Sequence, residues 1–419
     1  MTNLSTIFSG IPLAELASGA ESVTGTATDK ANTPAGLTAR LAIPEYYMSM
    51  HYKVTRSLRQ KAYGLDLDVS LAASNHSTAA NRYTIETPSG MEIDIGGVSY
   101  KTAVETEISL ATAGNYDSAG QTANYQTAAN RAGTDFYVYA EEPASGYEPA
   151  FIISTASTFP DGNTPAGNAR DANNTRKIGG FHCLCAAAGD IANHALCDYA
   201  IGDILFMSVW GLNNRPICSP AGMTRDINHA MTNSDGESVV ITGSGLWVDI
   251  YLTSGTGAST LSVNGGTISD NRNWMDFVDD YGSVGKRMLS DPEFQLIAAG
   301  SNEETNIAGS AASVTTGGHS DTASRRMISN IGCEDCCGVI GQWLSDQSSI
   351  YDDAVTAGWY DLAGAKGSLY RAADSNDSKL LAGGGWNAAA DSGSRDRGMN
   401  NPRWGSNAIF GSRGACEAL

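Results

Sequence analysis

Apolar and polar residues alternate with a period of two over 82–153, and this pattern predicts antiparallel β-structure. Within 83–95 the alternation is interrupted by Pro-Ser-Gly at 88–90, so this segment is expected to form a hairpin. Two further strands are predicted at 136–139 and 151–153, where aromatic and β-branched residues predominate. Together these strands predict a small antiparallel β-domain.

Other segments repeat at helical spacing. A helix is predicted over 44–63, which starts with proline and is followed by glycine. Its apolar stripe suits either an ordinary core or an oligomer axis, and the sequence leaves both open. A second helix is predicted over 274–281, where apolar residues fall at i, i+3, i+4 and i+7. A third is predicted over 292–299, with Asp291 as its N-cap and Gly300 as its stop.

These changes of pattern divide the chain into three parts. Residues 1–80 are rich in Ser, Thr, Gly and Ala before the first helix, and are expected to form an arm that orders against a partner. The β-domain is expected over 81–175, because a linker-like run of Gly, Asn, Pro and Ala closes it. Residues 176–419 are expected to form the last domain, with 339–343 in its core strand. The predicted fold class is α+β, and mainly β.

Composition and charge argue against several classes of partner. Charged residues make up 17% of the chain, below the roughly 25% usual in globular proteins, which favours turn-rich β-structure. The formal net charge of -19 opposes phosphate groups, so neither nucleic acid nor an anionic membrane surface is an expected partner. No apolar run reaches the roughly 18 residues of a membrane span, so no membrane insertion is expected. The N-terminus lacks the basic region of a signal peptide, which predicts folding in a cytoplasm.

The 8 cysteines of a chain that folds in a cytoplasm are expected to be reduced core residues. Two local clusters, FHCLC at 181–185 and GCEDCCG at 332–338, leave a structural zinc site open as an alternative. Their spacing differs from that of common zinc ligand pairs, so no metal and no cofactor are predicted. Neither His182 nor His319 lies in a recognisable Ser, Asp or metal constellation, and Cys416 has no nearby partner. An enzyme is therefore not expected, and no catalytic residues are assigned.

The stretch 383–416 has neither a helical nor an alternating period. It keeps Trp386 and Trp404 within a field of Gly, Ser, Asn, Asp and Arg, which predicts loops and short strands held by buried aromatic anchors. Small polar side chains between rigid aromatic residues are also typical of adaptable binding surfaces. This stretch is therefore the candidate binding region.

Long motifs in the second half of the chain resemble those of a known family. The run 285–346, the motif LLAGGGWN at 380–387 and the terminal GSRGAC are similar to the variable proteins of diversity-generating retroelements, a family that includes phage tropism determinants. The resemblance implies a C-type lectin-like fold for 176–419, with Gly338 and Trp343 matching its core strand. It also implies a homotrimeric, receptor-binding tip of a phage tail fibre. Residues 1–80 show no match to the family, and we expect them to serve trimerisation or particle attachment.

Retroelements of this kind rewrite template adenines. An AAC codon changed at its first two bases reaches Asn, Asp, Gly, Ala, Ile, Ser and Pro, but neither Trp nor Met. The resemblance therefore implies that the variable, ligand-facing residues within 383–416 are Asn387, Ala388, Asp391, Asp396, Gly398, Asn400, Asn401, Gly405, Asn407 and Ile409. The residues implied as scaffold anchors are Trp343, Trp386 and Trp404.

The function that the resemblance implies is host attachment by a protein of the virion. Its expected partners are a host cell-surface receptor, either protein or glycan, two further copies of the chain, and other phage tail proteins. Calcium-dependent sugar binding is not expected, because the ligand motifs of calcium lectins are absent. A fixed structural virion protein and a bacterial surface adhesin, each with the same fold and no diversification, are the alternatives.

Overall fold

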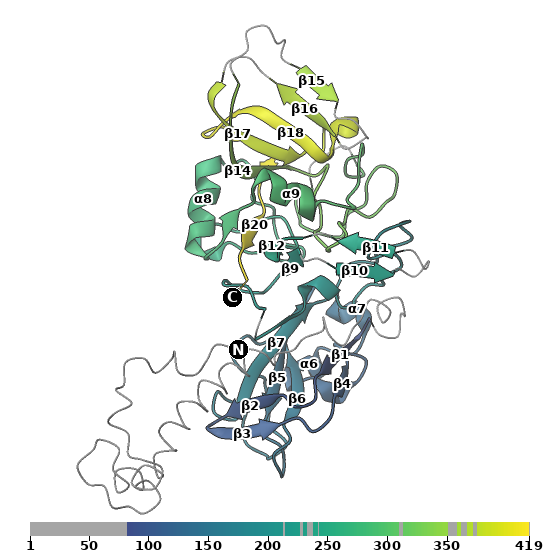
Figure 1. The fold of residues 1–419 in the computed structure, drawn as a ribbon, viewed down its shortest axis with the longest axis vertical. Helices are drawn as coiled ribbons and strands as arrows, with labels where there is room; N and C mark the ends of the chain where they lie inside the picture. Colours follow the sequence, from purple (N-terminus) through teal and green to yellow (C-terminus); the bar gives the residue numbers. More distant parts are fainter. Residues whose placement is uncertain are drawn as a thin grey trace, which may run out of the picture. The chain divides into compact units, whose positions relative to one another are not determined.

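A computed structural model of the chain describes residues 82–212, 214–226, 229–232, 238–241, 243–309, 313–350, 358–361, 367–371 and 375–418, all within one compact unit, Tyr63–Leu419 (Figure 1). The arm and the helix predicted within 1–80 lie outside these residues. The strands are, in chain order, β1 (Thr84–Thr87), β2 (Glu92–Ile95), β3 (Val98–Lys101), β4 (Thr106–Ser109), β5 (Asp135–Glu141), β6 (Ala150–Ser154), β7 (Thr175–His182), β8 (Trp210–Gly211), β9 (Met223–Asp226), β10 (His229–Thr232), β11 (Ser238–Ile241), β12 (Leu246–Asp249), β13 (Arg287–Met288), β14 (Gly341–Ile350), β15 (Gly358–Asp361), β16 (Ser368–Arg371), β17 (Ser375–Gly383), β18 (Gly393–Pro402), β19 (Phe410–Gly411) and β20 (Gly414–Cys416). The helices are α6 (Ser118–Thr122), α7 (Ala128–Arg131), α8 (Trp274–Ser283) and α9 (Asp291–Ile297), with 3-10 turns η4 (Ala113–Asn115), η5 (Phe206–Ser208), η6 (Gly257–Ser259) and η7 (Ala389–Asp391).

An antiparallel sheet ordered β6-β5-β7-β8 organises the first half of the described chain. Strands β5 and β6 confirm the strands predicted at 136–139 and 151–153. Strand β5 is buried on both faces, because Phe136 and Val138 belong to one core cluster while Tyr137 belongs to another. The strand therefore joins two hydrophobic clusters rather than separating a core from solvent.

This sheet extends past the predicted domain boundary at residue 175. Strand β7 pairs with β5 along its length, with Thr175 opposite Glu141 and His182 opposite Asp135. Strand β8 pairs with β7 in turn. The linker-like run before residue 175 predicts that β7 and β8 belong to the last domain. The structure assigns them to the first sheet, since backbone pairing overrides the composition of the preceding loop.

The hairpin predicted at 83–95 is wrong in its pairing. Strand β1 pairs with β4, and β2 pairs with β3, so the turn at 88–90 connects two different two-stranded sheets. The tight turn lies instead at Gly96 and Gly97, whose φ angles are 56° and 85°. Two consecutive residues with positive φ form the turn whose twist matches a two-residue hairpin. The signal for the true hairpin was therefore the Gly-Gly pair.

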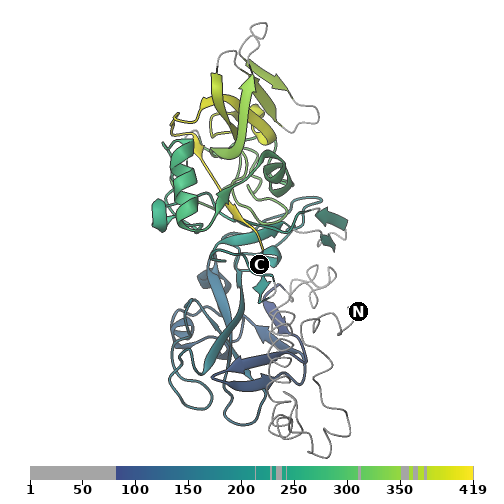
Figure 2. The ribbon, with the colours of Figure 1, turned by 60° about the vertical axis from the view of Figure 1, so that its left-hand side comes forward.

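The second half of the described chain contains two larger sheets. One is ordered β13-β20-β12-β9, with the C-terminal strand β20 between β13 and β12. The other is ordered β15-β16-β18-β17-β14-β19 (Figures 1 and 2). Its strand β14 carries the fully buried Trp343, which confirms the core strand predicted at this tryptophan. No helix in the described part of the chain has the length and apolarity needed to cross a membrane.

The two predicted helices near the middle of this half are confirmed, with differences in detail. Helix α8 begins after a capping box at Asn273, and it buries Phe277 and Tyr281, whereas Val278 is exposed. Helix α9 is capped by Ser290, not Asp291 as predicted, because the Ser290 side chain and Glu293 form the capping box. The buried face of α8 is therefore narrower than the predicted stripe, and α9 starts one residue earlier.

Candidate functional site

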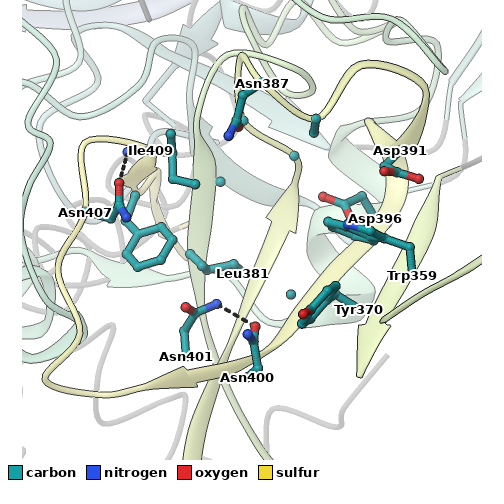
Figure 3. A pocket seen from close by; sticks show the side chains of 16 residues that line it. Trp359, Tyr370, Leu381, Asn387, Asp391, Asp396, Asn400, Asn401, Asn407 and Ile409 are labelled. Atoms are coloured by element: carbon teal, nitrogen blue, oxygen red, sulfur yellow. Dashed lines mark hydrogen bonds between the residues drawn. The ribbon is translucent and has the colours of Figure 1, made fainter. Parts of the chain in front are cut away.

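A cavity of about 360 Å³ opens on the six-stranded sheet, and nine of the ten residues predicted as variable line it (Figure 3). Strand β18 contributes several of them, the turn after β17 contributes others, and the loop before β19 supplies the rest. These lining residues are Asn387, Ala388, Asp391, Asp396, Gly398, Asn400, Asn401, Asn407 and Ile409. Gly405 is the exception, since its amide donates to the Pro402 carbonyl at 2.8 Å in the turn that follows β18.

Glycines in the GGGW motif set the path of the cavity wall. Gly383 has a φ of 86°, and a Cβ there would lie 2.3 Å from the carbonyl oxygen of Cys336. Only glycine therefore fits this close approach between β17 and the GCEDCCG segment. Immediately afterwards, the Trp386 amide donates to the Val339 carbonyl at 3.0 Å, which ties the loop to the core.

A buried arginine, Arg413, ties the segment that follows β19 to the core. The Arg413 side chain is 1% exposed, and its Nε donates to Oε1 of Gln342 at 3.1 Å. Its remaining guanidinium nitrogens donate to the backbone carbonyls of Asp249, Ile250 and Glu334. Because all these bonds go to core residues, Arg413 fixes the backbone next to β19. Phe410 of β19 lines the cavity.

Amide groups supply much of the polar lining. The Nδ2 of Asn401 donates to Oδ1 of Asn400 at 3.1 Å, and Oδ1 of Asn407 accepts from the Ile409 amide at 3.2 Å. Each amide carries more donors and acceptors than these bonds use. Asn387 is exposed at the rim. The lining thus offers hydrogen-bonding groups to a ligand without any fixed charge at these positions.

Asp396 differs from the other polar residues of the cavity because it is only 3% exposed. Its Oδ1 atom has no hydrogen-bond partner among the described residues. Burial raises the pKa of this carboxyl well above its ordinary value, and the neighbouring Arg397 charge offsets only part of that effect. The raised pKa extends to higher pH the range in which the acid is protonated, and in that form it offers a neutral hydrogen-bond donor to the cavity.

An aromatic wall faces these polar groups, and the sequence analysis did not predict it. Trp359 on β15 and Tyr370 on β16 both line the cavity, and their rings meet edge to face with centroids 5.1 Å apart. Trp359 is 45% exposed, and Tyr370 lies opposite Gly398 in the parallel pairing of β16 with β18. Both residues precede the region 383–416. The aromatic residues Trp359, Tyr360 and Tyr370, in two short segments separated by a glycine-containing loop sequence, were the signal that could have found them.

The three predicted scaffold anchors differ in burial. Trp343 is fully buried, and its ring meets that of Phe410 with centroids 5.2 Å apart. Trp386 is half-buried and packs against the core cluster that contains Val339. The prediction that Trp404 buries its ring is wrong, because this side chain is 63% exposed in the turn after β18. Trp386 and Trp404 lie in similar polar stretches of the sequence, and only the tertiary environment separates them.

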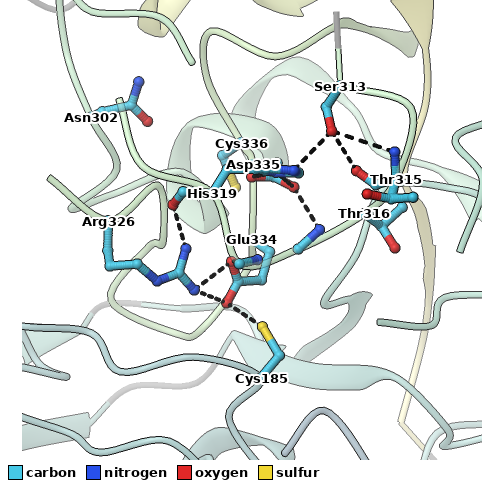
Figure 4. A network of polar contacts seen from close by, with 12 residues as sticks. Cys185, Asn302, Ser313, Thr315, Thr316, His319, Arg326, Glu334, Asp335 and Cys336 are labelled. Carbon is cyan, nitrogen blue, oxygen red and sulfur yellow. Dashed lines mark hydrogen bonds and ion pairs between the residues drawn. The ribbon is translucent and has the colours of Figure 1, made fainter. Parts of the chain in front are cut away.

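A second polar network surrounds His319 (Figure 4). Its Nδ1 lies 2.9 Å from both carboxylate oxygens of Asp335, and its Nε2 lies 2.8 Å from the Ser313 hydroxyl. The prediction from the sequence that His319 lies in no Ser or Asp constellation is therefore wrong. However, the Ser313 hydroxyl also donates to the Thr315 carbonyl at 2.8 Å, and Asp335 accepts from the Gly317 amide. Because the network closes on its own backbone, we interpret it as a clamp on the loop at 313–319.

His182 also has an acidic neighbour that the sequence did not reveal. Its Nδ1 lies 2.9 Å from Asp135, and its Nε2 lies 2.8 Å from the Tyr251 hydroxyl. Both ring nitrogens therefore have hydrogen-bond partners. The nearby thiol of Cys185 donates to the Glu334 carboxylate at 3.4 Å. Within the described part of the chain, no three His, Cys, Asp or Glu side chains gather as a metal site would require. The zinc alternative therefore finds no support in the geometry of these clusters.

The chain is similar to known proteins in sequence and in fold. Residues 75–211 match the family model described as the Mtd second domain. The chain is 25% identical over 318 residues to the tail fiber receptor-binding protein of Bordetella phage BPP-1, which covers 69% of this chain and 72% of that protein. Its fold is similar to those of the U1 and M1 variants of the major tropism determinant. Each has a TM-score of 0.57, with 23% and 22% identity, over 83% of this chain and 85% of the other.

These similarities confirm the resemblance found in the sequence. They also confirm the predicted fold class, which is α+β and mainly β, with a C-terminal C-type lectin-like domain after a β-domain. The matched second domain ends at residue 211, where β8 completes the first sheet. The assignment of variable residues stays a prediction, although the cavity brings nine of them together.

Proposed function

We propose that this chain is the receptor-binding protein of a phage tail fibre, and that the cavity on its six-stranded sheet is the surface that contacts the host receptor. One observation carries the proposal: nine of the ten residues nominated from the family resemblance and codon chemistry line a single cavity. Rigid strands support these residues while their side chains point into the open space, which is how binding sites combine stability with variable recognition. The tail-fibre relative from phage BPP-1 supports the same function.

We further propose that the lining residues are diversified by a retroelement. The cavity has two kinds of wall. Trp359, Tyr370 and Leu381 form an apolar part that precedes the region 383–416, and of these three residue types only Trp cannot arise from an AAC codon by changes at its first two bases. The other part consists of Asn, Asp, Gly, Ala and Ile side chains that such codons reach. A constant aromatic wall would supply contact area, while the opposite wall would determine which receptor binds.

The proposed partners follow from this function. The receptor is a host cell-surface protein or glycan, because aromatic rings, amides and a neutral carboxyl suit either. We propose a homotrimer in the virion, attached to other tail proteins through residues 1–80. With small side chains at many variable positions, each site should bind weakly, and the trimer would gain affinity by avidity. The function is binding, and no chemical step is assigned to any residue.

The experiment is a comparison of two tryptophan variants of the full-length protein. Trp359 and Trp404 are both exposed, at 45% and 63%, but only Trp359 lines the cavity. Trp359→Ala should reduce binding to susceptible host cells at least tenfold, the loss typical of an aromatic hot spot, whereas Trp404→Ala should bind like the unaltered protein. Equal binding by all three proteins would refute the cavity as the receptor site.

Diversification needs its own test. Sequencing the 3′ end of the gene in a growing phage population should reveal adenine-specific changes confined to codons of the lining residues, together with a nearby template repeat. A uniform sequence with no template would leave a fixed structural protein or adhesin with the same fold. That result would reject the retroelement proposal while leaving the cavity test above unaffected.

A further inference from the structure

Two cysteines that lie 198 positions apart in sequence bring their sulfur atoms to within 2.9 Å of each other. They are Cys218, in the loop before β9, and Cys416, at the end of β20. The prediction that Cys416 has no nearby partner is therefore wrong for the folded chain. The partner was invisible in sequence because only the pairing of the C-terminal segment brings it close.

The backbone explains why the two sulfurs meet. Pro216 and Ala418 form an antiparallel bridge, and the Ile217 amide donates to the Glu417 carbonyl at 3.0 Å. One further step inward places Cys218 opposite Cys416. In an antiparallel pair, residues flanking a hydrogen-bonded position lie at the closer spacing, with Cα atoms about 4.5 Å apart. That spacing falls within the range of about 4.4–6.8 Å that disulfides span.

We propose that Cys218 and Cys416 are a covalent modification site, at which a disulfide forms when the folded protein leaves a reducing compartment for an oxidising one. The cross-link fixes the C-terminal strand β20 to the loop before β9. Strand β20 follows Arg413, which fixes the backbone next to the cavity residue Phe410. The disulfide therefore secures covalently the end of the chain that supports the site.

The surroundings of the pair suit thiol–disulfide exchange. Cys218 is half-buried, so a small disulfide can reach its sulfur, whereas Cys416 is 1% exposed. The hydrogen bond between the two thiols lowers the pKa of Cys416, and the ammonium of Lys286 acts in the same direction. A thiolate is thus available in the pair at lower pH than in an isolated cysteine.

The exchange balances with a low-molecular-weight disulfide as the oxidant. The hydrogen bond that lowers the pKa of Cys416 raises the pKa of Cys218, so the Cys218 proton moves to the Cys416 thiolate as the Cys218 sulfur attacks the small disulfide. The attack forms a mixed disulfide and releases one small thiolate, which takes that proton from Cys416 and becomes a thiol. The Cys416 thiolate then attacks the Cys218 sulfur, forms the protein disulfide and releases the second small thiol. Two protein thiols are oxidised, one small disulfide is reduced to two thiols, and the two protons of the cysteines go to those thiols.

The other cysteines provide the contrast. Cys333 and Cys336 are also near neighbours, but both are fully buried, so a small oxidant has no access to them. Cys185 is half-buried, as Cys218 is, but its thiol donates to the carboxylate of Glu334. Reactivity is therefore expected at the Cys218 and Cys416 pair and not at these thiols. Cys185 supplies a matched control of similar accessibility.

The test uses the full-length chain, purified with reductant and then incubated with oxidised glutathione. After denaturation and alkylation of free thiols, the expected product carries six alkyl groups on its 8 cysteines and yields, on digestion, one cross-linked peptide that joins residues 218 and 416. Its thermal midpoint should exceed that of the reduced protein by several degrees, because the link closes a long loop in the unfolded chain.

Two variants complete the experiment. Cys185→Ser should form the cross-link and show the same rise of the midpoint. Cys218→Ser should match the reduced protein with reductant present, which establishes that it folds, and should show no rise on oxidation. Alkylation of both Cys218 and Cys416 after oxidation would overturn the proposal. So would a glutathione adduct that persists on Cys218 beside a free Cys416.

Discussion

Arg397 on β18 forms an ion pair with Asp291 at the first turn of α9, and this contact joins the cavity strand to the helix beside it. Its Nε donates to Oδ1 of Asp291 at 2.7 Å, and the guanidinium lies over the ring of Phe294, 5.2 Å from the centroid. Arg397 stands between Asp396 and Gly398, which both line the cavity. The pair therefore fixes the register at which β18 presents the site.

Removal of this guanidinium should destabilise the protein. Arg397→Met keeps much of the side-chain volume but leaves the partly exposed Asp291 without its partner. We expect a loss of about 2 kcal/mol in the free energy of unfolding, less than for a fully buried pair because water can reach Asp291. Urea unfolding followed by tryptophan fluorescence measures the loss. Arg395→Met on the same strand is the control, because Arg395 is exposed and its loss should be nearly neutral.

The buried carboxyl of Asp396 should make stability depend on pH. Because burial raises its pKa in the folded state above that of the unfolded chain, the folded protein binds this proton more tightly. Stability should then fall as the pH rises from the unfolded pKa, about 3.9, towards the folded one. Asp396→Asn, which resembles the protonated acid, should raise the thermal midpoint at neutral pH and flatten this dependence.

The control for that prediction is a solvent-exposed aspartate. Asp279→Asn on α8 replaces an exposed carboxylate, and it should change neither the midpoint nor its pH profile appreciably. If Asp396→Asn lowered the midpoint at neutral pH, the carboxylate rather than the acid would be the stable form in the cavity.

The sequence was most informative where a local pattern and the fold require the same residue. The strands at 136–139 and 151–153, the two central helices and the buried Trp343 follow from the period of apolar residues, helix start signals and side-chain size. Nine of the ten residues predicted to be variable also line one cavity, although codon chemistry says nothing about distance. Their convergence arises because β17, β18 and the loops around them fold back on one another.

The errors arose where long-range pairing decides the outcome. Nothing near Trp404 distinguishes it from Trp386, yet only Trp386 finds a core cluster to pack against. Tyr370 joins the cavity through parallel pairing with β18, which no local pattern encodes. The partner of Cys416 lies 198 residues away for the same reason.

The clamp around His319 should make stability depend on pH. Burial alone would lower the pKa of this imidazole, but the hydrogen bond and negative charge of Asp335 outweigh it and raise the pKa. A raised pKa means that the stabilisation is fully present below the unfolded value, about 6.5, and is lost as the pH rises through the folded value. The thermal midpoint of His319→Gln should therefore lie furthest below that of the unaltered protein in acid, in a series from about pH 5.5 to about pH 8.5.

Ser313→Ala separates the two contacts of this imidazole. It removes the hydroxyl at Nε2 but leaves Asp335 at Nδ1, so the pH dependence of the midpoint should survive. A profile as flat as that of His319→Gln would show that Ser313, and not Asp335, is the group that holds the proton on the ring.

The close approach at Gly383 gives the last prediction, which separates backbone strain from steric overlap. Gly383 and Gly146 have nearly equal φ angles, 86° and 83°, but a Cβ at Gly146 would meet no atom within 4 Å. Gly146→Ala should therefore cost about 1 kcal/mol, from the positive φ alone. Gly383→Ala should cost about 3 kcal/mol, because the added methyl must also displace the Cys336 carbonyl or the loop that leads to Trp386. Since that loop forms one wall of the cavity, Gly383→Ala should also weaken receptor binding, whereas Gly146→Ala should not. Equal losses of stability in the two variants would mean that β17 and the GCEDCCG segment are not in contact at this point.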